Sequence, residues 1–309
     1  MRTAYLLVSH GSSDPRHLAG LNRLAHATRP YLTRSFAAEP PSVAAILRGQ
    51  SDLNSPWPQP SASWPLDALE SSSLPFTESS QDAPIIGVAT LEAHKVSLAQ
   101  QIAVFAQNVW SQGMRQVVIV PLFLLAGIHV KEDLPQEIAA AEAQLPARLQ
   151  LTCAPYLGGA GDFKHYVSQR LARVEADQCI LLAHGSRRPA GNRALQKLGT
   201  MLNTDVAFWS VPPDLETQVA NSMQRGYRRI AIAPFFLFPG SITDVITRRT
   251  EALAEAFPKL SLRLLSPLGT SADLGQVVAE LALNAALGSS KGRWQSGSAH
   301  SVAKNTITA

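Results

Sequence analysis

The sequence has few of the residues that build disulfide or cysteine-metal frameworks. Only two of its 309 residues are cysteines, Cys153 and Cys179, and they form no CxxC pair. Both lie in or beside apolar runs. We therefore expect reduced core thiols in a cytoplasmic protein, not a disulfide scaffold.

Charge and long apolar runs are also scarce. Charged residues make up 16% of the chain, the net charge is +4, and no Lys/Arg block occurs, so a nucleic acid partner is not favoured. The first apolar run ends at Ser9, which is too short for a signal segment or a membrane span. The sequence has no P-loop, so no use of ATP is implied. Apolar residues nevertheless reach 46%, enough for the cores of two domains.

Apolar runs of strand length alternate with longer segments of helical pattern. The strand-like runs are continuously apolar, which is typical of parallel sheets covered on both faces. We therefore predict an α/β fold in which each small parallel sheet is flanked by helices. The predicted strands are 4–8, 85–91, 117–122, 149–154, 180–183, 206–209, 230–235 and 260–265, and the predicted helices are 18–32, 96–110, 134–145, 163–174, 190–202, 215–226, 242–257 and 274–287.

The chain also contains an internal repeat. NVWSQGMRQVVIVPLFLLAG and NSMQRGYRRIAIAPFFLFPG align without gaps, with each residue 113 positions from its counterpart. VSHGSS near the start is matched by LAHGSR, but His10 and His184 lie 174 positions apart. The first copy therefore holds about 60 additional residues, most of them in a Pro- and Ser-rich segment without periodicity.

This repeat predicts two domains from one duplication. We expect an N-terminal domain at 1–175 and a C-terminal domain at 176–287. The segment 38–83 is predicted to be a disordered insertion in the first domain, and 288–309 a disordered tail, because neither has the apolar pattern of a packed element.

Three residues of metal-binding types follow strands of the first domain. His10 follows the first strand, Glu92 the second and His129 the third. Each alone is more typical of a capping or solvated residue, but the ends of neighbouring parallel strands share one edge. Two imidazoles and one carboxylate suit Fe(II), Co(II), Ni(II) or Zn(II) with open coordination positions. Asp133 and Ser12 are residue types that cap helix N-termini. For Asp133 the alternative is a contact with His129.

VSHGSSDPR, the LE expected to begin a helix after the second strand, and VPLFLLAGIHVKEDLP resemble the sirohydrochlorin chelatases of the CbiX/SirB type, class II tetrapyrrole chelatases. The resemblance is to the long form with two chelatase-like domains, and it implies that His10, Glu92 and His129 handle the metal and carry catalysis. The run around Glu92 reads TLEAHKVSL, where the family has an FLELxEP-like run. In the second half His184 remains, but Trp209 or Ser210 stands near the glutamate position and Ile242 at the second histidine position.

The resemblance implies a lyase that inserts a divalent metal, most simply Fe(II), into sirohydrochlorin to form sirohaem. The metal would be a substrate, and no permanently bound cofactor is implied. Ser12, Arg16, Lys131, His184 and Arg187 are candidate contacts for the tetrapyrrole and its carboxylates, although solvation is the ordinary role of exposed basic residues. Because one chain supplies both halves, a monomer is expected.

Three other interpretations stay open at this point. Cobalt insertion into sirohydrochlorin for cobalamin synthesis uses the same chemistry. A non-catalytic metal or tetrapyrrole carrier would bind tightly without turnover. A histidine phosphatase also begins with His-Gly after its first strand, but Ser9 stands here where that mechanism needs an arginine.

Overall fold

The computed structural model describes residues 2–34, 83–187 and 189–288. The two segments predicted to be disordered, 38–83 and 288–309, lie outside the described residues except for residues 83 and 288. No helix in the described ranges is long and apolar enough to cross a membrane.

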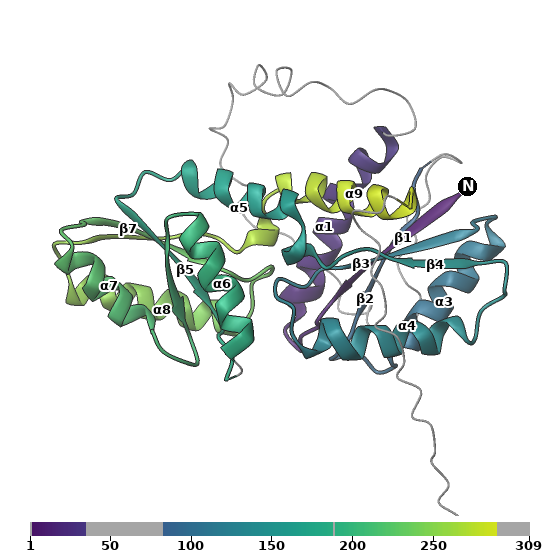
Figure 1. Cartoon of the computed structure of the whole chain (residues 1–309), viewed down its shortest axis with the longest axis horizontal. Helices are drawn as coiled ribbons and strands as arrows, with labels where there is room; N and C mark the ends of the chain where they lie inside the picture. The colour runs from purple at the N-terminus through teal and green to yellow at the C-terminus, as the bar shows by residue number, and fades with distance from the viewer. Residues whose placement is uncertain (1, 35–82, 188, 289–309) are drawn as a thin grey trace, which may run out of the picture.

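The predicted alternation of strands and helices is confirmed along both halves (Figure 1). The first half contains β1 (Thr3–Ser9), α1 (Pro15–Arg34), β2 (Ile86–Thr90), α3 (Leu98–Ser111), β3 (Gln116–Pro121), α4 (Leu134–Glu142), β4 (Gln150–Cys153) and α5 (Gly161–Ala172). The second half contains β5 (Gln178–Ala183), α6 (Pro189–Met201), β6 (Asp205–Phe208), α7 (Leu215–Gln224), β7 (Arg229–Pro234), α8 (Ser241–Ala256), β8 (Ser261–Leu264) and α9 (Asp273–Ala286).

The strands form two four-stranded parallel sheets of matching topology. Their orders are β2-β1-β3-β4 and β6-β5-β7-β8. The Leu122 N–H donates to the Val8 carbonyl at 2.7 Å, and the Phe235 N–H donates to the Leu182 carbonyl at the same distance. These paired contacts reproduce the two offsets seen in the sequence, so the duplication is visible in the backbone.

Both faces of each sheet are buried, which explains the continuously apolar strands. In β1, Leu6 and Val8 pack with α3 and α4, whereas Tyr5 and Leu7 face the opposite layer. Cys153 and Cys179 are free thiols, and burial raises the pKa of Cys153 to about 12. Both cysteines are packed against the cores, as predicted for core thiols.

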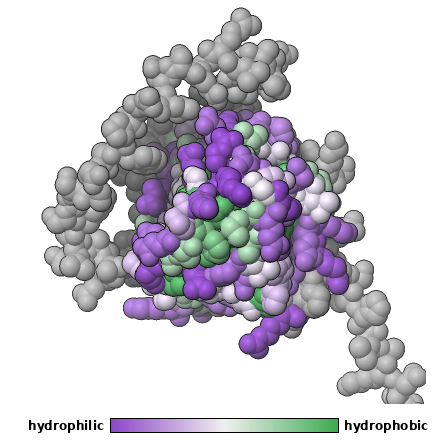
Figure 2. Space-filling view, turned by 90° about the vertical axis from the view of Figure 1, so that its left-hand side faces the viewer, coloured by the Kyte–Doolittle hydropathy of each residue, from purple (hydrophilic) through white to green (hydrophobic). Residues whose placement is uncertain are grey.

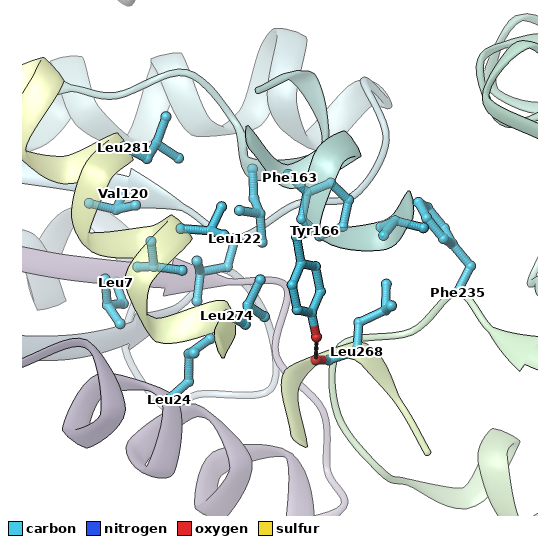
Figure 3. Close-up of a cluster of buried hydrophobic side chains, with 14 of the residues drawn as sticks. Leu7, Leu24, Val120, Leu122, Phe163, Tyr166, Phe235, Leu268, Leu274 and Leu281 are labelled. Carbon is cyan, nitrogen blue, oxygen red and sulfur yellow. Dashed lines mark hydrogen bonds between the residues drawn. The ribbon is translucent and has the colours of Figure 1, made fainter. Parts of the chain in front are cut away.

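The last helix of each half packs on the other half. Helix α9 closes the second half in sequence, yet it lies beside α1 over the first sheet, where Gln116 Nε2 donates to the Ala286 carbonyl at 3.4 Å (Figure 1). Helix α5 lies over the second sheet, with the Phe163 ring 6.2 Å from that of Phe235. The Tyr166 hydroxyl donates to the Leu268 carbonyl at 2.7 Å (Figure 3). The two halves therefore share one continuous apolar core.

The surface is polar over most of the face that the second half presents. Figure 2 shows that face, with a small group of hydrophobic residues surrounded by hydrophilic ones. An apolar area of this kind is ordinary on a globular protein and identifies no site by itself.

The close approach of α9 to α1 generates a test of the helix exchange. A Cβ atom on Gly275 would stand 2.6 Å from the Ala27 carbonyl oxygen, a backbone atom that cannot rotate away. We expect Gly275→Ala to lower the free energy of unfolding by about 1–3 kcal/mol, although alanine favours helices by about 1 kcal/mol over glycine. Urea unfolding followed by circular dichroism measures this change. Gly161→Ala is the matched control, because nothing lies within 4 Å of its Cβ position; an equal loss in both variants would contradict the assignment.

Candidate metal centre

The order of the first sheet brings three strand ends together. Strand β1 lies between β2 and β3, so the residues that follow these strands meet at one edge. The Glu92 N–H donates to the His10 carbonyl at 2.8 Å, which continues the pairing of β1 and β2 beyond the sheet. His10 and Glu92 are therefore held side by side by the backbone.

Gly11 allows this close approach. Its φ of +98° is in the left-handed region, and a Cβ atom there would stand 2.1 Å from the Glu92 carbonyl oxygen. Only glycine fits such a position without displacing the chain. The glycine of the HGS motif thus brings the loop after β1 against the backbone of Glu92.

His10, Glu92 and His129 form a cluster whose ligand atoms all lie within 4.8 Å of one another. The two imidazole rings are 4.6 Å apart between centroids and tilted by 58°. His10 Nδ1 lies 3.6 Å from Glu92 Oε2, too far for a hydrogen bond, so neither atom is committed to the other. Ligands on one ion at about 2.0–2.2 Å are at most about 4.4 Å apart, so small side-chain rotations would suffice to bind it.

The cluster is open to solvent. The side chains of His10 and Glu92 are 49% and 55% exposed, and that of His129 is 30% exposed. Two nitrogens and one carboxylate leave room for further ligands on a transition metal. The geometry therefore allows an ion to enter from solvent.

His129 is positioned by a π-helical turn (His129–Asp133) that leads into α4. The Leu134 N–H donates to the His129 carbonyl, the wide spacing of a π turn, which recurs at functional sites. His129 Nδ1 lies 2.7 Å from Asp133 Oδ2. An ionised carboxylate only accepts, so Nδ1 carries the proton and Nε2 keeps the lone pair that a metal needs.

Two local predictions at this edge are wrong. Asp133 makes no capping hydrogen bond; its carboxylate turns to His129 instead, the alternative contact. Glu92 does not begin a helix, because α3 starts at Leu98 with Ser97 as its cap. Glu92 lies in a loop before α3, and the next residue, Ala93, has a left-handed φ of 58°.

Arg16, a candidate contact for a substrate carboxylate, is paired with carboxylates of the protein itself. Its guanidinium is occupied by Asp14 at 2.6 Å and by Asp244 of α8, at 2.9 and 2.7 Å for the two carboxylate oxygens. Hydrogen bonds from Arg16 hold the pKa of Asp14 at about 2 and lower that of Asp244. Arg16 therefore links the two halves beside the metal cluster.

His17 is a neighbour of the cluster that the sequence pattern does not reveal. Its Nε2 lies 3.0 Å from Ser9 Oγ, and its ring packs edge-on against Phe238 of the second half at 5.1 Å. Burial, and next the charge of His10, lower the pKa of His17. Its place in the first turn of α1, directly after the HGS loop, is the signal that could have pointed to it.

The other candidate contacts are distributed around the strand ends. Ser12 Oγ accepts from the Asp14 N–H at 3.1 Å, before α1 begins, so Ser12 does not cap the helix. Lys131 is exposed in the same turn as His129, and Arg187 is exposed in the loop after β5. His184 is exposed too, with Nδ1 at 3.0 Å from the Gly185 carbonyl. Their contacts with a tetrapyrrole stay predictions.

The second half has lost the matching cluster. The Ser210 N–H donates to the His184 carbonyl at 2.9 Å, as the Glu92 N–H does to His10, so Ser210 occupies the glutamate position. Ile242 stands 113 residues after His129. Among the residues described, the first half holds the one group of three or more metal-binding side chains that lie close together.

Asp133 offers a direct test of how His129 is held. We expect Asp133→Asn to weaken metal binding about 10- to 100-fold, because the amide can no longer fix the proton on Nδ1. Binding of Co(II) measured by its visible absorption would give the affinity. Glu132→Gln removes an exposed carboxylate from the neighbouring position and should leave the affinity near that of the unaltered protein. Equal effects of the two substitutions would reduce the role of Asp133 to surface charge.

Sequence comparison places these features among known proteins. Over 186 residues the chain is 26% identical to the sirohydrochlorin ferrochelatase of Priestia megaterium, an alignment that covers 56% of this chain and 68% of the relative. It is 30% identical over 105 residues to the chloroplastic sirohydrochlorin ferrochelatase of Arabidopsis thaliana, covering 31% of this chain and 46% of the relative. The Bacillus subtilis enzyme of that name is 23% identical over 49% of this chain and 62% of the relative.

Solved structures share the fold along nearly the whole chain. The sirohydrochlorin chelatase SirB from Bacillus subtilis subspecies spizizenii, in complex with cobalt, superposes with a TM-score of 0.61 at 17% identity, covering 94% of this chain and 97% of the other. The CbiX structure described as the terminal enzyme for biosynthesis of siroheme in denitrifying bacteria gives a TM-score of 0.56 at 17% identity, covering 91% and 99%. At this identity these matches establish the fold.

The family model matches the chain twice. It covers residues 75–174 and 178–285, one match in each half. With the two matching sheets and the repeated HGS loops, the conclusion is that this chain belongs to the CbiX/SirB family of sirohydrochlorin chelatases, with two CbiX units in one polypeptide.

Proposed function

We propose that this protein inserts a divalent metal ion into sirohydrochlorin, with Fe(II) as the metal and sirohaem as the product. The observation that carries the proposal is the His10, Glu92 and His129 cluster at the strand edge of a CbiX unit. We propose iron rather than cobalt because the three relatives compared above are all named ferrochelatases. The donor atoms themselves suit Co(II) equally, and cobalt insertion is the alternative.

The first step is capture of the ion. Nε2 of His129 is directed by Asp133, and His10 and Glu92 supply the other donors from neighbouring strand ends. Three protein ligands on an exposed site hold the ion while leaving positions that the macrocycle nitrogens can take. A closed four-ligand site would instead retain the metal, as structural sites do.

The second step is exchange of protons for the metal in the macrocycle. Insertion of M²⁺ forms bonds to the ring nitrogens and releases two protons from the inner N–H groups. A neutral imidazole can accept such a proton near neutral pH, and Glu92 can accept the other. The centroids of the His10 and His129 rings lie 4.6 Å apart, which supports a single side of the macrocycle for both the ion and the proton acceptors.

A metal or tetrapyrrole carrier of the same fold remains a competitor. A carrier binds its cargo without chemical change, so it would yield a stable complex with unaltered sirohydrochlorin. The two functions are separated by anaerobic incubation of catalytic amounts of protein with sirohydrochlorin and Fe(II) or Co(II), following the visible spectrum. Several turnovers per chain support the enzyme, and a single stoichiometric change supports the carrier. The ratio of kcat/KM for the two metals in competition identifies the preferred one.

Removal of the ligands should abolish turnover without unfolding the protein. We expect His10→Ala and His129→Ala each to lower kcat/KM at least about 100-fold, and Glu92→Gln to lower it less, since each removes a donor or proton acceptor used in the reaction. His165→Ala is the control, because this histidine is exposed on α5 and its ring contacts the side chain of Gln169. Near-normal turnover of either ligand variant at saturating metal would remove the cluster from the mechanism.

His184 should affect a different parameter. Because Ser210 and Ile242 occupy the other two ligand positions of its half, His184 lacks the partners for a second metal site of this kind. We expect His184→Ala to raise the KM for sirohydrochlorin by a few-fold and to leave the KM for metal unchanged. A rise in the metal KM as large as that of His10→Ala would show that both halves hold one ion.

A further inference from the structure

A polar hollow lies apart from the metal cluster, where helix α5 meets the end of β8. It has a volume of about 360 Å³, and none of the three cluster residues lines it. One wall comes from α5 of the first half, and the other comes from β8 and the loop before α9. The hollow therefore spans the junction at which the two halves exchange helices.

Positive charge dominates this hollow. Arg170, Arg173 and Arg263 line it, and Asp273 is the one carboxylate in the lining. Arg173 pairs with Asp273 at 3.1 Å, but both side chains are more than half exposed, at 57% and 60%. An exposed ion pair contributes little free energy, so a stronger anion can replace the Asp273 carboxylate.

The other two arginines differ in how they are held. Arg170 is fixed by hydrogen bonds to the Ser266 carbonyl and hydroxyl, at 2.5 and 2.9 Å, and to the Tyr166 hydroxyl at 3.3 Å. The side chain of Arg263 lines the hollow and has no hydrogen-bond or ion-pair partner within the part of the chain that is described. A guanidinium offers several N–H donors, so Arg263 leaves a full set of donors for a ligand.

The duplicated copy lacks these charges. Residues of α5 and β8 correspond to residues of α9 and β4 that lie 111 positions away, as Leu157–Gly159 does to Leu268–Thr270. At this spacing Arg170 corresponds to Leu281, Arg173 to Asn284 and Arg263 to Thr152. Leu281 is buried in the shared core. The three arginines are thus a property of one copy and not a requirement of the fold.

We propose that this hollow binds a small multivalent oxyanion, of the phosphate class, between α5 and β8. Guanidinium forks match the paired oxygens of phosphate and of carboxylate, and the hydroxyls of Ser266 and Ser271 can donate to the same ligand. The bound anion joins an element of the first half to an element of the second, so it stabilises the folded chain in proportion to its occupancy. This proposal does not depend on the metal chemistry.

The test is saturable binding at constant ionic strength. Phosphate is added to the full chain while sodium chloride is reduced to keep the ionic strength constant. Binding is followed by thermal unfolding and by isothermal titration calorimetry. The same titrations with sulfate and with citrate distinguish a tetrahedral anion from a polycarboxylate. We expect a rise in Tm that follows phosphate concentration to a plateau, with a heat of binding at the same concentrations. Arg263→Gln should weaken phosphate binding at least 10-fold, because it removes the charge without removing a contact that holds the fold.

Arg193→Gln is the matched control, since it removes the same charge from an exposed position on α6. It should bind phosphate as the unaltered protein does. The proposal is overturned if phosphate and chloride act alike at equal ionic strength, or if Arg193→Gln loses as much affinity as Arg263→Gln. Stronger binding of citrate than of phosphate would overturn the phosphate class specifically.

Discussion

The exchange of last helices is the packing constraint on which the rest of the molecule depends. Helix α9 supplies apolar side chains to the first sheet, and α5 supplies them to the second, so neither sheet is covered by its own half alone. The Arg16–Asp244 ion pair and the His17–Phe238 ring contact join the halves beside the metal cluster. The metal site is therefore positioned by inter-half packing as well as by its own strands.

The two halves use one architecture for unequal tasks. The backbone contact between the first two strand ends is the same in both, yet it places Glu92 beside His10 in one half and Ser210 beside His184 in the other. The hollow between α5 and β8 is a second difference between the copies. Its arginines lie on α5 and β8, and the matching elements α9 and β4 lack them. Each copy has thus kept the backbone of the unit while its side chains specialise.

The sequence predicted the strands, the parallel sheets and the convergence of His10, Glu92 and His129, because continuous apolar runs and strand ends are local features. It did not predict that α5 packs on the second sheet and α9 on the first, since an apolar helix face does not identify the sheet on which the helix will pack. The pairing of Arg16 with Asp244 also could not be predicted, because Asp244 lies 228 residues away. The role of His17 was missed for a similar reason: its partner Phe238 belongs to the other half.

Helix α9 also determines when the first half can finish folding during synthesis. The hydrogen bond from Gln116 to Ala286 joins residues 170 positions apart, and α9 is the last described helix of the chain. Until the ribosome has produced α9, the face of the first sheet on which α1 packs is only partly covered, even though all four strands have emerged. N-terminal domains commonly fold early during synthesis, but here the first half can complete its packing only after α9 of the second half has been made.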